Sequence, residues 1–204
     1  MKKSLILTLG LCMGLTLSAA DGNLMKNGGF EKISKSTKSS SKYLMQKIKE
    51  GWHVGNGPLA ILPTNWVLNM GAAKVEMLKK ADDAKNVHSG EYAMKVTATK
   101  TSHLYTSGAK GGTYDISYWA KGNGTVYIVA YCYCTDKKIR SITLMNNKVA
   151  GDEWKEFKKT VDVKKLCPQV NSFAFAVAFA KNSVVVIDDI SLAPAAAPAT
   201  QASK

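Results

Sequence analysis

Arginine is nearly missing from this basic chain. Of its 204 residues, 28 are lysine or arginine and 15 are acidic, which gives a formal net charge of +13, yet Arg140 is the only arginine. The planar guanidinium reads phosphates and guanine edges in a bidentate way, whereas the lysine ammonium is a hydrated point charge. The composition therefore argues against sequence-specific nucleic-acid recognition. Two interpretations of the lysines stay open: they attract anionic polymers in general, or lysine is simply the default surface residue.

Motifs for catalysis and for membrane insertion are also lacking. The sequence has no GxSxG, P-loop or HExxH pattern, and the histidines (His53, His88 and His103) stand in no nucleophile arrangement. The acidic residues lie mostly in expected turns, such as Asp82-Asp83, and give no hint of a pair flanking a glycosidic bond. After residue 20, no apolar run is long enough to span a bilayer. We therefore predict a noncatalytic protein without stable membrane insertion.

Residues 1–20 have the features of a signal peptide. Lys2 and Lys3 precede an apolar stretch that is too short for a comfortable membrane span, and Ser18 and Ala20 fit the −3 and −1 positions of a cleavage site. This pattern predicts a secreted or periplasmic protein. The Pro/Ala-rich end, residues 193–204, is expected to be a flexible tail. The predicted folded domain is therefore residues 21–192.

Cysteine is scarce in the predicted mature chain, which keeps Cys132, Cys134 and Cys167. Cys132 and Cys134 are two residues apart in an expected strand, so both point to one face and are poorly placed to bridge to each other. Two interpretations stay open: a disulfide from Cys167 to one of them, or three small buried hydrophobic side chains. No histidine at ligand spacing favours a metal site at these thiols.

Alternation of apolar and polar residues is the main structural signal. Turn signals such as Gly122-Asn123-Gly124, Asn146-Asn147 and Ala150-Gly151-Asp152 separate the alternating runs, and no βαβ pattern appears. Short strands with regular turns predict an all-β fold, an antiparallel β-sandwich or jelly roll. One or two helical turns are expected at 43–51. The expected strands are 91–98, 113–121, 125–134, 138–144, 154–163, 172–180 and 183–192.

Several short motifs follow one another in a distinctive order. They are the opening Asn23-Leu24-x-x-Asn27-Gly28-Gly29-Phe30-Glu31, a segment with Trp66, HSGEYAMKV at 88–96, YDISYWAK at 114–121, a strand with Trp154 and Phe157, and VIDDISL at 186–192. This order resembles the family 4/9-type carbohydrate-binding modules, which are galactose-binding-like jelly rolls. The resemblance covers nearly all of residues 23–192.

The resemblance implies an exported, noncatalytic module that binds a polysaccharide or oligosaccharide. The positive charge adds acidic glycans to the expected ligands. An alternative of another class is an extracytoplasmic structural or interaction domain of the same fold, which binds a protein or a cell-envelope polymer.

The resemblance also implies a structural Ca²⁺ ion. Glu31 and Asp188 occupy the matching ligand positions, and the loop at Ser89 and Gly90 would complete the shell with carbonyl oxygens. Hard oxygen ligands from distant strands suit calcium. In the alternative interpretation, Glu31 and Asp188 only accept backbone or lysine hydrogen bonds.

Exposed aromatic rings are the expected sugar contacts, because such rings stack on sugar faces. If the even-numbered residues of 114–120 face the core, Trp119 and Lys121 face outward. In the next expected strand, the tyrosines lie opposite a small apolar face and would form a stacking platform, with Arg140 adding hydrogen bonds. The expected carbohydrate-binding residues are Trp66, Trp119, Lys121, Tyr127, Tyr131, Tyr133 and Arg140.

One alternative interpretation and one observation weigh against this expectation. The tyrosines could instead form the core, with the cysteine face outside. In addition, residues 172–180 offer only alanines on their second face, which would leave a site there without stacking or hydrogen-bonding groups. Trp154 is expected to pack rather than to bind sugar.

Overall fold

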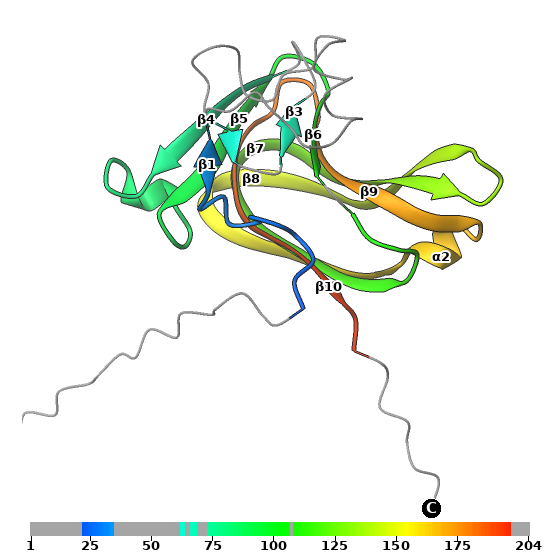
Figure 1. The fold of residues 1–204 in the computed structure, drawn as a ribbon. Helices are drawn as coiled ribbons and strands as arrows, with labels where there is room; N and C mark the ends of the chain where they lie inside the picture. Colours follow the sequence, from blue (N-terminus) through cyan, green and yellow to red (C-terminus); the bar gives the residue numbers. More distant parts are fainter. Residues whose placement is uncertain (1–21, 35–61, 64–65, 69–72, 107, 197–204) are drawn as a thin grey trace, which may run out of the picture.

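A computed structural model describes residues 22–34, 62–63, 66–68, 73–106 and 108–196 (Figure 1). The expected signal peptide at 1–20, the expected helical turns at 43–51 and the end of the expected tail at 197–204 lie outside the described residues. Among the described residues, no helix is long and apolar enough to cross a bilayer. The predicted all-β antiparallel fold is confirmed.

The described elements are strands with two short helical segments. The strands are β1 (Ile33–Ser34), β2 (Leu62–Pro63), β3 (Val67–Leu68), β4 (Ala73–Lys79), β5 (Tyr92–Ala98), β6 (Ser102–Thr106), β7 (Thr113–Cys134), β8 (Ile139–Asp162), β9 (Val170–Phe179) and β10 (Val184–Pro194). The helical segments are the 3₁₀ turn η1 (Ala84–Asn86) and α2 (Val163–Leu166).

Eight strands form one sheet that curls on itself. Its order is β3-β6-β9-β7-β10-β5-β4, and β8 pairs with β7. The first part of β7 pairs with β10 and its later part with β9, whereas β8 follows β7 along most of its length. The two halves of the sheet therefore become the two layers of a jelly-roll sandwich (Figure 1).

A glycine bend carries β7 from one layer to the other. Gly122 (φ 110°) and Gly124 (φ 157°) adopt a backbone conformation that side-chain-bearing residues rarely take, and a side chain at either would collide with Val184 or Ser183. Pairing continues through the bend, with Gly122 opposite Gly151. The predicted turns at 122–124, 146–147 and 150–152 are wrong, because all three lie within the continuous strands β7 and β8. Glycine here bends a continuous strand rather than reversing the chain.

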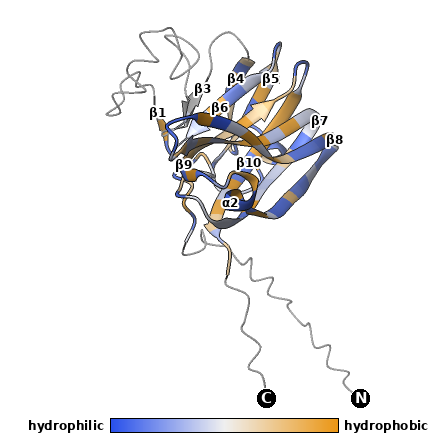
Figure 2. Cartoon of the chain, turned by 90° about the vertical axis from the view of Figure 1, so that its right-hand side faces the viewer, coloured by the Kyte–Doolittle hydropathy of each residue, from blue (hydrophilic) through white to orange (hydrophobic). Residues whose placement is uncertain are grey.

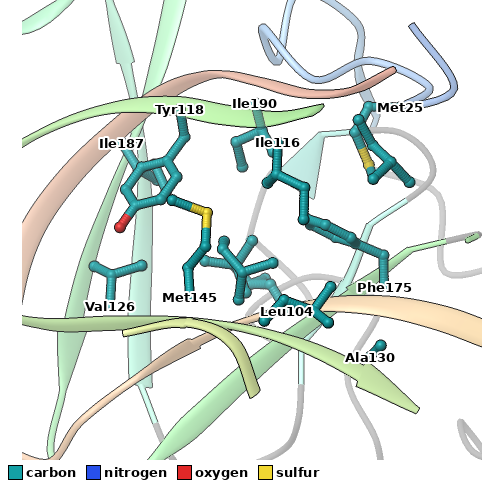
Figure 3. Close-up of a cluster of buried hydrophobic side chains, with 14 of the residues drawn as sticks. Met25, Leu104, Ile116, Tyr118, Val126, Ala130, Met145, Phe175, Ile187 and Ile190 are labelled. Carbon is teal, nitrogen blue, oxygen red and sulfur yellow. The ribbon is translucent and has the colours of Figure 1, made fainter. Parts of the chain in front are cut away.

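The core lies between the two layers. Tyr118 of β7 and Ile187 of β10 point across the sandwich toward Val126 of β7, Leu104 of β6 and Phe175 of β9 (Figure 3). All five side chains are fully buried. Burial of a large apolar side chain stabilises a fold by about 1.5–3 kcal/mol, so this contact between the layers is the main force that holds the sheet curled.

Lysine protects the long strand β8, which pairs only with β7 among the described strands. Most of its residues are exposed, and its outer edge is mainly hydrophilic (Figure 2). Charged side chains on an edge strand oppose pairing with another chain. Part of the positive charge therefore has a structural reason. The lysines of β8 are Lys148, Lys155, Lys158 and Lys159.

Candidate functional site

The outer surface of the layer β6-β9-β7 carries a cluster of tyrosines, which we call the tyrosine face. It consists of His103 and Tyr105 on β6, Ala174, Ala176 and Ala178 on β9, and Tyr127, Val129, Tyr131 and Tyr133 on β7. The alternate residues of β7, from Val126 to Cys134, point into the core. The structure thus excludes the alternative in which the tyrosines form the core and the cysteines lie outside.

A row of alanines lets rings from two non-adjacent strands meet. On β9, Ala176 stands opposite Tyr105 of β6, and Ala174 stands opposite Tyr131 of β7. The rings of Tyr105 and Tyr131 lean over this row, with centroids 5.5 Å apart and planes tilted by 42°. His103 stacks on Tyr105 at 5.7 Å. From the sequence, the alanine row was expected to leave this surface without stacking groups. In the structure it is instead the floor on which the aromatic rings lie.

The tyrosine face is uncharged and is bordered by small polar groups. Ser141, Thr143 and Asn146 of β8 stand opposite Tyr131, Val129 and Tyr127 of β7. Burial lowers the pKa of His103, which keeps its imidazole neutral at pH 7. Rings flanked by hydroxyl and amide groups can stack on an apolar ligand face and hydrogen-bond its rim.

Trp119 and Lys121 lie on the opposite outer face of the sandwich. The ring of Trp119 is stacked by His88 at 3.9 Å. Lys121 is only 7% exposed, donates to the Lys85 carbonyl at 2.8 Å and lies 5.3 Å from the Trp154 ring centre. Both side chains are engaged in local packing, and the structure does not bring them to the tyrosine face. The expectation that Trp154 packs is confirmed.

Two further predicted sugar contacts lie away from the tyrosine face. Arg140 points to the other side of β8 from Ser141 and makes a bidentate ion pair with Asp136, at 2.9 and 2.7 Å. Trp66 is only 1% exposed; it packs edge-on against Phe30 and donates its indole N–H to the Asn27 carbonyl. Trp66 is a core residue in this structure, so its ring offers no surface to a sugar.

Carboxylates gather where the opening segment meets β10. The Asp188 side chain is fully buried and accepts backbone N–H groups from His88, Ser89 and Asp189 at 3.1, 3.3 and 2.8 Å. Burial, together with the adjacent Asp189 charge, raises its pKa to about 8 despite these hydrogen bonds. Asp188 is thus a buried acid whose ionised form is disfavoured by its burial and by the charge of Asp189.

The other predicted calcium ligands converge on the same loop. Glu31 accepts the N–H groups of Glu91 at 2.9 Å and Tyr92 at 3.4 Å. Its carboxylate lies against Gly90, whose φ of 60° and missing side chain make room for it. Among the described residues, no group of three or more His, Cys, Asp and Glu side chains is placed to hold a metal ion. A cation bound here would therefore need backbone carbonyls, as the sequence suggests.

Sequence reasoning missed part of the tyrosine face. Tyr105 and His103 lie on β6, a five-residue strand that no expected range included. The alternation of Ser102, Leu104 and Thr106 with these aromatic residues was the available signal, and it is shorter than the other runs. The polar residues of β8 could not be paired with the tyrosines before the register of β7 and β8 was known.

Comparisons with known proteins give a likeness of fold. No protein-family model matches this sequence, and no curated protein matches it. Among solved structures, the CBM22-1–GH10 modules of a Clostridium thermocellum endo-1,4-β-D-xylanase, complexed with xylohexaose, align at 15% identity and a TM-score of 0.51, over 65% of this chain and 26% of theirs. The CBM22-1–CBM22-2 tandem domain of a Paenibacillus barcinonensis xylanase aligns at 14% identity and 0.50, over 68% and 43%. A CBM61 structure with β-1,4-galactotriose aligns at 20% identity and 0.46, over 85% and 99%.

The chain thus spans well under two thirds of the length of the two xylanase structures. At these identities the likeness concerns the fold alone. The chain shares its jelly-roll fold with solved carbohydrate-binding modules.

Proposed function

We propose that this protein is an exported, noncatalytic module that binds a glycan on its tyrosine face. The observation that carries the proposal is the meeting of Tyr105 and Tyr131 over the alanine row, beside the polar residues of β8. Sugar rings present apolar C–H faces edged by hydroxyl groups, which such a surface complements. The proposal also draws on the order of sequence motifs that resembles the family 4/9 type, whereas the solved structures named above come from families 22 and 61.

The charge of the tyrosine face favours a neutral glycan. Its defined residues carry no carboxylate and no ammonium group, in a chain with a net charge of +13. An acidic glycan would have to be attracted by lysines elsewhere on the surface, and that attraction weakens with salt. Stacking and hydrogen bonding on an uncharged face depend little on salt.

Affinity electrophoresis tests this function. We expect xylan or β-1,4-galactan in the gel to retard the protein, with equal retardation at low salt and at high salt. Polygalacturonate serves as the acidic comparison. If it alone retards the protein and salt abolishes this retardation, the result would support electrostatic binding by surface lysines instead of binding on the tyrosine face. Failure to retard on every neutral and acidic polysaccharide would refute glycan binding and favour the alternative, a domain that binds a protein or an envelope polymer.

We further propose that Ca²⁺ binds where Glu31 and Asp188 meet the loop at Ser89 and Gly90. The residues fit the ion in chemistry, because they supply hard carboxylate and carbonyl oxygens from three distant segments. The support is Asp188, a buried acid with a raised pKa, whose ionised form a bound cation would stabilise. The role of the ion would be structural: it would tie the opening segment to β10.

The pH dependence of stability distinguishes the calcium-bound from the calcium-free protein. The folded-state pKa of Asp188, about 8, lies above the unfolded value near 3.8. The calcium-free fold therefore binds the Asp188 proton more tightly than the unfolded chain does. The contribution of this proton to the unfolding free energy is lost as the pH rises from about 4 to 8. The slope is at most about 1.4 kcal/mol per pH unit.

Chemical denaturation in EDTA and in millimolar CaCl₂, at pH 5 and pH 8, measures this effect. With calcium we expect a higher unfolding free energy at pH 8 than in EDTA, since a ligand that binds only the folded state stabilises it. Asp136→Asn, which alters an acid far from the site, should keep the calcium response. Identical curves in EDTA and calcium at both pH values would rule out the site.

A further inference from the structure

A thiol pair joins the end of β7 to the segment after α2. The sulfur atoms of Cys134 and Cys167 lie 3.4 Å apart, although the residues are 33 positions apart in the sequence. Both side chains are buried. A disulfide has a sulfur–sulfur bond of about 2.05 Å, so the two sulfur atoms lie about 1.4 Å beyond bonding distance.

Backbone hydrogen bonds hold both segments in place. Thr135 donates its N–H to the Gln169 carbonyl at 2.9 Å, directly beside the thiol pair. The backbone N–H of Cys134 donates to the Lys138 carbonyl at 3.0 Å. The backbone N–H of Cys167, just after α2, donates to the carbonyl of Val163, the first residue of α2, at 2.9 Å. The two cysteines therefore meet because of the fold and not because two loops happen to touch.

Cys132 is the competing partner, and its surroundings disfavour it. It lies on the same core face of β7 as Cys134, stands opposite Phe173 of β9 and is completely buried. Burial, with Cys167 and Cys134 nearby, raises the pKa of its thiol to about 12. Cys132 is also buried more deeply than Cys134, which is 7% exposed, and the sulfur atom of Cys167 lies 3.4 Å from that of Cys134.

We propose that Cys134 and Cys167 form a disulfide when the protein folds under oxidising conditions, and that Cys132 stays reduced. The oxidant is a disulfide, such as that of oxidised glutathione or of a disulfide oxidoreductase. One cysteine thiolate attacks this disulfide, forms a mixed disulfide and releases one thiol; the second cysteine then displaces the other. Two electrons pass to the oxidant, and the two cysteine protons end on the released thiols.

The bond is expected to form during folding rather than in the folded protein. Burial raises the pKa of Cys167, and neither thiol of the pair is open to solvent once the layers have closed. The cross-link would fix the end of the strand that carries Tyr131 and Tyr133. Closing a loop of this length stabilises mainly by restricting the unfolded chain.

Refolding of the full chain tests the proposal. The Cys12→Ser chain, which keeps three cysteines, is unfolded, reduced and refolded with reduced and oxidised glutathione. We expect a denaturing thiol assay to fall from three thiols to one. Cleavage at Tyr133 separates Cys132 from Cys134, so peptide mapping should show Cys134 joined to Cys167. The oxidised protein should melt about 5–15 °C above the reduced protein.

Cys132→Ser is the matched control, because it removes a neighbouring thiol and should keep the cross-link and the gain in melting temperature. Three free thiols after refolding of a protein with native circular dichroism would overturn the proposal. A map that joins Cys132 to Cys167 would also overturn it. Because the oxidant is supplied, these outcomes do not depend on export or on glycan binding.

Discussion

Tyr131→Ala is expected to weaken glycan binding about 5- to 30-fold while leaving the fold intact. The substitution removes one of the two rings that meet over the alanine row, a contact at 5.5 Å on the surface of the sheet. Loss of one stacking ring costs about 1–2 kcal/mol, which corresponds to that change in dissociation constant. Isothermal titration with the oligosaccharide of the best-retarding polysaccharide measures the effect, and thermal melting confirms the fold.

Two variants show whether the ring and this face are responsible. Tyr131→Phe keeps the ring and removes only the hydroxyl, so it should retain most of the affinity. Trp119→Ala removes a larger aromatic side chain on the opposite outer face, where the ring is stacked by His88, and should leave the affinity unchanged. Loss of binding in Trp119→Ala, with wild-type binding in Tyr131→Ala, would place the ligand on the wrong face for our proposal.

Trp66→Ala is expected to lower the unfolding free energy by about 3–5 kcal/mol, the usual cost of deleting a large buried aromatic side chain. The Trp66 ring packs edge-on against Phe30, 5.7 Å between centroids, and its N–H satisfies the Asn27 carbonyl. The melting temperature should fall by about 10 °C or more. Denaturant titration and calorimetry measure the change.

Trp66→Phe separates the packing of Trp66 from its hydrogen bond. Phenylalanine keeps much of the buried area but cannot donate to Asn27, so its cost should be smaller than that of alanine. The glycan affinity of Trp66→Ala, measured at a temperature where this variant is still folded, should equal that of the wild type. Wild-type stability combined with lost affinity would show that Trp66 is a sugar contact after all.

The sequence was most informative where apolar and polar residues alternate over many positions. That alternation puts Val126, Ile128 and Ala130 on one face and the tyrosines on the other, and the structure shows that the first face is the core. It was least informative at Gly122 and Gly124, because glycine serves both tight turns and bends within a strand. The pairing of Gly122 with Gly151 shows that the strand continues through the glycines, and this pairing depends on residues far along the chain.

The candidate site could be predicted only in part for the same reason. The sequence could predict that Trp119 faces away from the core. It could not predict that Trp119 lies on the other outer face of the sandwich from the tyrosines, because that depends on the bend in β7. The burial of Trp66 depends on Phe30, a residue 36 positions earlier. The motif order predicted Glu31 and the loop at Gly90 as calcium ligands; the structure shows Glu31 accepting backbone hydrogen bonds beside this loop, and calcium binding stays a prediction.

The continuous ribbon of β7 and β8 has a consequence for the route of folding. Its two strands are joined by residues 135–138 and pair across the bend, so this ribbon can assemble from one end with little loop-closure entropy. Pairing of β10 with β7 joins Trp119 to Asp188 and must close a long stretch of chain. Non-local pairing of this kind slows folding. The ribbon is thus a part of the sheet that needs little loop closure, and β9 and β10 pair with its two halves on either side of the bend.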